Sequence, residues 1–232
     1  MIRSTLSGIS ETHLCTRLET RFIGVPVHRD VVAPFFRLKD AAAREGFDLE
    51  ILSGFRGFES QLSIWNRKVR GERAVLDSDA VPMDITRMSD RELVFAILRW
   101  SALPGASRHH WGTDLDVYDS AAKPEGYEIE LIPEEVDSGG MFGPLHDWLD
   151  GRMSRSEAFG FFRPYDRDRN GVAPERWHLS CAPVADPLFE GLTVEVLRQT
   201  VEVSEMELKQ TVLEHLDEIF DRFVINIGRP RS

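Results

Sequence analysis

Short stretches with the hydrophobic period of a strand are scattered among longer stretches with the period of a helix, and this pattern constrains the fold most. Apolar residues recur every three to four positions over residues 31–44, whereas residues 47–52 alternate apolar and acidic side chains. The later strand-like stretches do not alternate regularly with helices, as the strands of a parallel sheet do. The sequence therefore predicts an α+β fold.

The helical and extended stretches can be placed along the chain. We expect helices over residues 31–44 and 58–70, each followed by a glycine that favours helix termination. A further helix is expected after Ser89, because Ser89 and Glu92 form a capping box and an apolar stripe follows. The other expected elements are a turn and short strand over 107–118, short helices near 145–149 and 158–159, the second opened by a capping box over 154–157, and a strand over 177–180.

The sequence changes character after Pro187. Residues 193–223 are helix-prone, with a capping box over 204–207 and an apolar stripe at helical spacing. We therefore expect a main domain over residues 1–187 and a C-terminal helical extension over 188–232. This extension is expected to pack on the main domain or to serve in homodimerisation.

The balance of charge limits the partners of the chain. Among 232 residues, 28 lysines and arginines stand against 39 aspartates and glutamates, a formal net charge of −11. An acidic surface repels phosphate backbones, so no nucleic-acid partner is expected. The densest basic stretch, residues 67–70, is interpreted as a solvated helix face.

The sequence also bears on compartment. No run approaches the roughly 18 apolar residues of a membrane span, so no membrane partner is expected. The first residues lack the apolar core of a secretory signal, which predicts a cytoplasmic location and leaves export by another route open. Two cysteines, Cys15 and Cys181, are too few for a disulfide scaffold.

Histidines and carboxylates gather in two places. His109 and Asp116 stand on either side of an expected turn at Gly112, and Glu175 precedes His178 by three residues. Two imidazoles and one carboxylate, with an open fourth position, are the ligand type of a catalytic zinc. A straight strand would send residues seven apart to opposite faces, so His109 and Asp116 converge only if the chain bends at Gly112.

A catalytic zinc site also needs a carboxylate that carries protons without binding the metal. Glu175 fits this role by its proximity to His178, provided that a kink or loop precedes Trp177. Each of these spacings is common in proteins, and the helical HExxH pattern of other zinc peptidases is absent. Spacing alone therefore leaves the assignment open.

Three motifs taken together resemble the D-Ala-D-Ala carboxypeptidase family typified by VanY and VanX, peptidase family M15. They occur in the order of that family and cover roughly residues 50–180. The resemblance implies a Hedgehog/DD-peptidase-like fold, with a small, mostly antiparallel sheet flanked by helices. The motifs are Ser53-Gly54-Phe55-Arg56 followed by Gln61, Ser107-x-His109-x-x-Gly112-x-x-x-Asp116, and Glu175-x-Trp177-His178.

The resemblance implies a role for each matching residue. The zinc ligands would be His109, Asp116 and His178, and Glu175 would be the catalytic base. Arg56 would steady the substrate carbonyl and the developing oxyanion, a task that suits a permanently charged guanidinium with several donors. Ser107, which belongs to the second motif, would bind substrate or brace the turn.

Two residues of the second motif depart from or add to the family pattern. Many relatives carry a small residue at the position of Asp114, and in a regular strand Asp114 shares a face with Asp116. Asp114 is therefore expected behind a ligand, facing substrate, or as a rival ligand. His110 adjoins a ligand and is expected to point elsewhere, at the rim of the site or against a neighbouring group.

The expected activity is zinc-dependent hydrolysis of an amide bond in a peptidoglycan-type peptide. D-alanyl-D-alanine carboxypeptidase or dipeptidase activity is favoured, with a peptidoglycan-derived peptide or the D-Ala-D-Ala dipeptide as partner. One alternative is a wall endopeptidase that cuts another bond, such as L-Ala-D-Glu. The other is a non-catalytic, metal-containing binding domain of the Hedgehog type.

Overall fold

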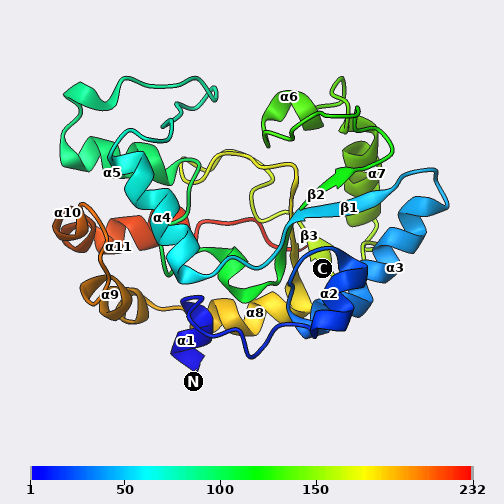
Figure 1. Cartoon of the computed structure of the whole chain (residues 1–232), viewed down its shortest axis with the longest axis horizontal. Helices are drawn as coiled ribbons and strands as arrows, with labels where there is room; N and C mark the ends of the chain where they lie inside the picture. Colours follow the sequence, from blue (N-terminus) through cyan, green and yellow to red (C-terminus); the bar gives the residue numbers. More distant parts are fainter. Residues whose placement is uncertain (1, 231–232) are drawn as a thin grey trace.

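A small antiparallel sheet lies at the centre of the molecule, between two groups of helices (Figure 1). The computed structural model describes residues 2–230. The order of the strands is β1-β2-β4-β3, and every neighbouring pair is antiparallel, which confirms the predicted α+β class. The strands are β1 (Leu49–Ser53), β2 (Asp114–Asp119), β3 (Phe161–Phe162) and β4 (His178–Cys181).

Helices precede, separate and follow the strands. Before β2 come α1 (Ile2–Leu6), α2 (Arg17–Ile23), η1 (Arg29–Val31), α3 (Val32–Ala43), α4 (Phe58–Val69), η2 (Ile85–Arg87), α5 (Asp90–Leu98) and η3 (Arg108–Trp111). After β2 come α6 (Pro133–Val136), α7 (Gly143–Ser154), α8 (Ala182–Gly191), α9 (Val194–Glu202), α10 (Lys209–Glu214), α11 (Leu216–Ile219) and the short π-helix η4 (Phe220–Val224).

Most of the elements predicted before residue 150 are present. The helices α3 and α4 end within a residue or two of the predicted bounds, and β1 follows α3 as expected. The capping box of α5 forms as predicted, because Ser89 accepts a hydrogen bond from the amide of Glu92 and the Glu92 carboxylate accepts one from the amide of Ser89. Local signals were sufficient here because each helix also buries its apolar stripe.

The prediction of a short helix near residues 158–159 is wrong. Ser154 belongs to the last turn of α7, where its hydroxyl donates to the carbonyl of Gly151 (2.8 Å) instead of opening a new helix. Ser156 and Phe159 then adopt positive φ values of 57° and 54°, which a helix does not allow. This segment is a tight turn into the edge strand β3.

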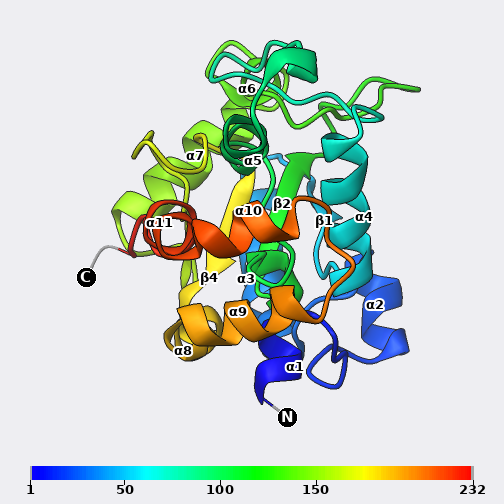
Figure 2. The ribbon, with the colours of Figure 1, turned by 90° about the vertical axis from the view of Figure 1, so that its left-hand side faces the viewer.

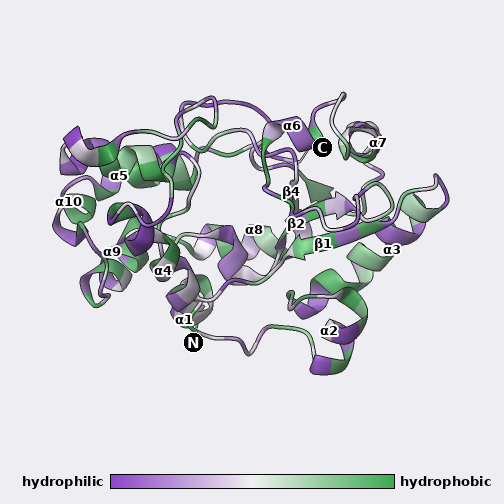
Figure 3. Ribbon diagram, turned by 45° about the horizontal axis from the view of Figure 1, so that its top comes forward, coloured by the Kyte–Doolittle hydropathy of each residue, from purple (hydrophilic) through white to green (hydrophobic). Residues whose placement is uncertain are grey.

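The prediction of a capping box over residues 204–207 is also wrong. The hydroxyl of Ser204 donates to the carbonyl of Val201 (2.8 Å), so it closes the end of α9. Leu208, with a φ of 56°, then starts α10. The helix-prone region 193–223 is therefore divided into several short helices, and α9 and α10 carry both hydrophobic and hydrophilic residues (Figure 3).

The apolar core includes two large clusters, of which one contains residues of the strands and the other is formed by helices and the segments between them. One joins α3, α7 and residues of the strands, with Phe35, Leu115 and Leu145 buried at its centre. The other joins α4 and α5 with α8–α11, and Trp65 and Leu216 are fully buried in it. Figure 2 shows the C-terminal helices lying across the front of the sheet. Helix α8 runs across the boundary predicted at residues 187 and 188.

The C-terminal residues also contact the loop that connects β3 and β4. The amide of Gly228 donates to the carbonyl of Pro164 (2.7 Å), and the side-chain amide of Asn226 donates to the carbonyl of Arg169 (2.9 Å). This loop, residues 163–177, is thus held from outside by hydrogen bonds to its backbone carbonyls. Over the described residues, no helix has the length and apolar character needed to cross a membrane.

Candidate metal centre and active site

His109 is positioned by a short helix that ends at a glycine. It lies in η3, and Gly112 closes that helix with a φ of 65°. A Cβ atom at Gly112 would lie 2.6 Å from the backbone nitrogen of His28, so the turn requires glycine both for its conformation and for space. The chain therefore bends between His109 and β2, as the sequence required.

Asp116 and His178 face each other across the middle of the sheet. They are directly opposite in the antiparallel pair of β2 and β4. Side chains at opposed positions project from the same face and lie within about 5.5 Å of each other at Cβ. The register of two strands, which sequence spacing does not reveal, thus brings these residues together.

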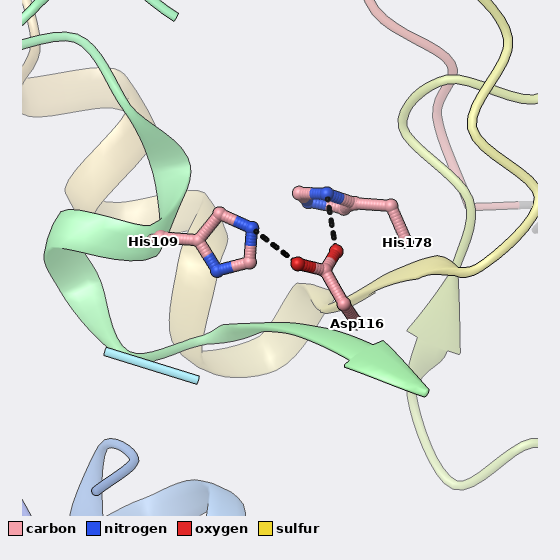
Figure 4. Close-up of side chains that lie close together, drawn as sticks. All are labelled: His109, Asp116 and His178. Atoms are coloured by element: carbon pink, nitrogen blue, oxygen red, sulfur yellow. Dashed lines mark ion pairs between the residues drawn. The ribbon is translucent and has the colours of Figure 1, made fainter. Parts of the chain in front are cut away.

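The three predicted ligands converge on one point (Figure 4). One ligand atom from each of His109, Asp116 and His178 lies within 4.8 Å of the others, and all three residues are buried. Nε2 of His109 is 3.4 Å from Oδ2 of Asp116, and Nδ1 of His178 is 3.3 Å from Oδ1 of Asp116. The arrangement offers two imidazole nitrogens and a carboxylate to a single cation.

The second nitrogen of each imidazole is already engaged. Nδ1 of His109 donates to the carbonyl of Gly54 (2.8 Å), and Nε2 of His178 donates to Oδ1 of Asp114 (3.0 Å). With those nitrogens engaged, His109 Nε2 and His178 Nδ1 are the nitrogens left to face Asp116. Metal-binding histidines are typically oriented in this way by a carbonyl or a carboxylate.

The residues present fit a divalent cation such as zinc. Oδ1 of Asp116 is buried and has no hydrogen-bond partner among residues 2–230. Burial opposes its charge, but the adjacent His109 and His178 hold the pKa of Asp116 well below its usual range. Nitrogen and oxygen donors in this number suit zinc. The donor set and the unsatisfied oxygen both indicate a site for positive charge.

Asp114 lies behind His178 and is not one of the three converging ligands. It is fully buried, and besides His178 it accepts hydrogen bonds from Nε of Arg108 (2.7 Å) and from the hydroxyls of Thr113 (2.7 Å) and Ser180 (3.2 Å). Burial disfavours its charge, but Arg108 and His178 outweigh burial and lower the pKa of Asp114. Of the three placements expected for Asp114, the structure has the one behind a ligand.

Glu175 lies beside the three ligands and retains some access to solvent. The amide of His178 donates to the carbonyl of Glu175 (3.1 Å), which forms the turn that the sequence required before Trp177. Oε2 of Glu175 is 3.3 Å from Nδ1 of His178, and the side chain is 13% exposed. A carboxylate in this position can exchange protons with a group bound near the ligands.

Arg56 enters the site from the loop after β1. Its amide donates to the carbonyl of His109 (3.0 Å). Its guanidinium donates to Oε1 of Gln61 (3.1 Å) and to the hydroxyl of Ser53 (3.2 Å). These bonds hold the Arg56 side chain against the same cavity that Ser107 lines.

That cavity, called the site cavity below, has a volume of about 320 Å³. A second cavity of about 810 Å³ adjoins it, and the two share Trp100, Tyr165 and Trp177 as walls. The larger cavity includes none of the converging ligands. The site cavity is therefore the candidate active site. Its polar walls are formed by Arg56, Lys68, Arg73, Ser107, Arg108, His109, Asp116, Glu130, Glu175 and His178.

His110 points away from the ligands, as expected, but it is fully buried and not at a rim. Its Nδ1 donates to the carbonyl of Arg56 (2.6 Å), and its Nε2 accepts from the amide of Gly105 (3.0 Å). Burial lowers its pKa to about 4, so the ring is neutral. His110 ties together the two loops that carry Arg56 and His109.

The interpretation of residues 67–70 as a solvated face is wrong for Lys68. This side chain is 6% exposed and lines the site cavity, whereas Arg67 remains exposed at the surface. Tyr165, also without an expected role, places its ring 5.0 Å from that of His178. Lys68 was missed at the level of sequence, although it follows Gln61 by seven residues, about two helical turns, a spacing that places both residues on one helix face.

Comparison with known proteins gives one strong match and several partial ones. The model of the VanY family, described as D-alanyl-D-alanine carboxypeptidase, matches residues 25–184. An uncharacterised protein of Haemophilus influenzae is 30% identical over 125 residues, which cover 53% of this chain and 93% of that protein. A D-alanyl-D-alanine carboxypeptidase of Enterococcus faecalis is 28% identical over 151 residues, covering 63% of this chain and 45% of that protein.

Similar solved structures include VanYB in complex with D-alanine-D-alanine, with a TM-score of 0.47, 22% identity and coverage of 75% of this chain and 83% of that chain. Another is a mutant of the vancomycin resistance D,D-pentapeptidase VanY in complex with Zn(II). It has a TM-score of 0.48 and 23% identity, and the match covers 74% of this chain and 84% of that chain. The family match carries the conclusion, because it spans more than half of the 232 residues and includes every motif described above. The chain belongs to the VanY family of D-alanyl-D-alanine carboxypeptidases.

Proposed function

We propose that this protein is a zinc-dependent peptidase that releases the terminal D-alanine from a peptidoglycan-type peptide. The observation that carries the proposal is the convergence of His109, Asp116 and His178 within 4.8 Å, with Glu175 at 3.3 Å from His178. Membership of the family supports D-alanyl-D-alanine carboxypeptidase or dipeptidase activity.

His109, Asp116 and His178 would hold the zinc ion, which supplies a Lewis acid that polarises a carbonyl and makes water more acidic. Glu175 accepts a proton from the attacking water and delivers it to the amine that leaves when the carbon–nitrogen bond breaks. Arg56 donates hydrogen bonds to the carbonyl oxygen as negative charge develops there. Ser107, at the wall of the site cavity, is proposed to contact the peptide.

The experiment that tests this proposal compares defined peptides. Purified protein with added zinc is incubated with the D-Ala-D-Ala dipeptide, with a stem peptide ending in D-Ala-D-Ala, and with a peptide containing the L-Ala-D-Glu bond. Products are identified by mass spectrometry, and zinc content is measured by elemental analysis. We expect one zinc per chain and release of D-alanine, both abolished by a chelator and restored by zinc.

The matched variant is Glu175→Gln, which keeps the shape of the side chain and removes its basicity. We expect it to retain zinc and to lose activity by roughly 10²- to 10⁴-fold. Cleavage of L-Ala-D-Glu alone would make the protein an endopeptidase. A protein that holds zinc and cleaves none of the peptides would be a binding domain of the Hedgehog type.

A further inference from the structure

The site cavity contains a buried cation that the proposed reaction does not use. Lys68 projects from α4 two turns after Gln61, the residue that holds Arg56. Its side chain is 6% exposed and lines the same cavity as His109, Glu175 and His178. Lysine is almost never buried to this extent unless its charge has a partner.

Among the described residues, no hydrogen bond or ion pair within 4.0 Å reaches the Lys68 ammonium. The carboxylates of the cavity near the ligands are engaged elsewhere: Asp116 faces the two histidines, and Oε2 of Glu175 is 3.3 Å from His178. Burial and, to a smaller extent, the charge of Arg73 lower the pKa of Lys68, Glu175 opposes them, and the result is a pKa of about 8. Near neutral pH the ammonium is therefore mostly charged, and no carboxylate of the described residues lies within 4.0 Å of it.

An unpaired buried charge destabilises a folded protein, so its partner is expected to be a ligand. We propose that Lys68 binds the C-terminal carboxylate of the substrate and thereby makes the site specific for the last peptide bond of a chain. This inference rests on the proposed function and names the group that the enzyme recognises.

The other cations of the cavity are less suited to this task. The guanidinium of Arg56 is held by Gln61 and Ser53 and is assigned to the carbonyl of the cleaved bond. Arg73 is exposed at the surface. An ammonium is a compact charge with three donors, and its hydrogen bonds to a carboxylate are about twice as strong as neutral ones.

The size of the cavity agrees with recognition of a chain end. About 320 Å³ lies at the lower limit of small-molecule pockets, which suits a terminal residue better than a continuing chain. A peptide that continued past the cleaved bond would place a neutral amide near Lys68 and leave the ammonium uncompensated. Lys68 thus favours a carboxypeptidase or dipeptidase over an endopeptidase.

The experiment compares an N-acylated D-Ala-D-Ala peptide with its C-terminal amide, on the zinc-loaded protein. The variants are Lys68→Met, Lys68→Arg and, as a matched control, Arg67→Met, which removes a neighbouring positive charge from the exposed face of α4. We expect wild type to prefer the acid, and Lys68→Met to lower kcat/KM for the acid by roughly 10- to 100-fold, mainly through KM. Activity on the amide should change little, so the preference disappears.

Lys68→Arg should keep part of the preference, and Arg67→Met all of it. Equal losses on acid and amide, or no loss on either, would overturn the inference. Calorimetric binding of the same two peptides to Glu175→Gln, with and without Lys68→Met, separates recognition from turnover. Acid binding that depends on Lys68, together with a zinc-loaded wild type that cleaves none of the peptides, would support the inference while contradicting the proposed function.

Discussion

Charged side chains are held differently on two walls of the site cavity. On the sheet wall, formed by Arg108, His109, Asp116 and His178 with Asp114 behind them, nearly every charge meets an opposite charge or a hydrogen-bonding group. On the α4 wall, formed by Ile64 and Lys68, the buried charge has no such partner among residues 2–230.

In the mechanism proposed above, this difference corresponds to two separate tasks, metal binding and substrate recognition. A metal ligand must keep one orientation, so its free nitrogen is bonded to a fixed acceptor. A group that recognises substrate gains most when its partner arrives with the substrate, because a permanent counterion would compete with it. The predictions below test whether the two walls respond to mutation in opposite ways, and begin with the largest effect.

Removing a ligand from the sheet wall should abolish function. Asp116→Ala leaves only two imidazoles, and we expect loss of zinc binding and a fall in kcat/KM of at least about 10³-fold, because the metal contributes to both substrate polarisation and acidity of water. Elemental analysis and peptide hydrolysis measure the two effects. Retention of stoichiometric zinc by Asp116→Ala would show that the cation binds elsewhere.

Breaking the network behind His178 should affect stability as well as metal binding. Asp114→Ala leaves Arg108, a buried cation, without its carboxylate, and we expect a loss of about 3–5 kcal/mol in the free energy of unfolding. Zinc affinity should also fall by roughly 10- to 100-fold, because His178 loses its acceptor.

Urea denaturation of the apo protein and competition with a chromogenic chelator measure these two quantities. The double variant Arg108→Met with Asp114→Ala should recover part of the stability and little of the zinc affinity. If the single variant leaves zinc affinity unchanged, Asp114 does not orient His178.

The α4 wall should respond in the opposite sense. Lys68→Met removes an unpaired buried charge and keeps the aliphatic length of the side chain, so we expect a gain of about 1–2 kcal/mol in the free energy of unfolding. Denaturation in urea, with Arg67→Met as the control, provides the measurement. A destabilised Lys68→Met would mean that the ammonium has a structural partner, and the contrast between the walls would fail.

The smallest expected effect concerns pH. The pKa of Lys68 is lowered to about 8, so the ammonium loses its proton as the pH rises through 8, and affinity for a carboxylate-ended peptide should fall severalfold between pH 7 and 9. The charged groups that line the cavity with Lys68 are Arg56, Arg73, Arg108, Glu130 and Glu175, besides His109, Asp116 and His178.

Calorimetry on Glu175→Gln measures this pH dependence without turnover. Lys68→Arg keeps its charge throughout the range and should flatten the curve. An identical decline in Lys68→Arg would assign the pH dependence to another group.

The sequence predicted the parts of the fold that local signals control. The capping box at Ser89 and the apolar stripes of α3 and α4 formed as expected, since each agrees with burial. The capping boxes at 154–157 and 204–207 failed, because the hydroxyls of Ser154 and Ser204 were used by the preceding helix ends. A four-residue pattern does not distinguish the start of one helix from the end of another.

For the site, the sequence motifs identified which residues come together. They did not show how these residues come together, because this depends on the register of the paired strands. Asp116 and His178 are 62 positions apart in the chain and become neighbours only through the pairing of β2 and β4. The burial of Lys68 could not be read from its basic neighbours, since one helix face is solvated and another lines a cavity. Which face of α4 is buried depends on how the helix packs against distant parts of the chain.

The hydrogen bonds from Gly228 and Asn226 to the loop of Glu175 have a consequence for remote substitutions. The loop keeps its course because a segment more than 50 positions later in the chain acts as a buttress on its outer side. Substitutions that break these hydrogen bonds would let the Glu175 carboxylate change position. His109, Asp116 and His178 would keep their places, because they lie in η3, β2 and β4. In the proposed mechanism, such substitutions would slow turnover and leave metal binding unchanged.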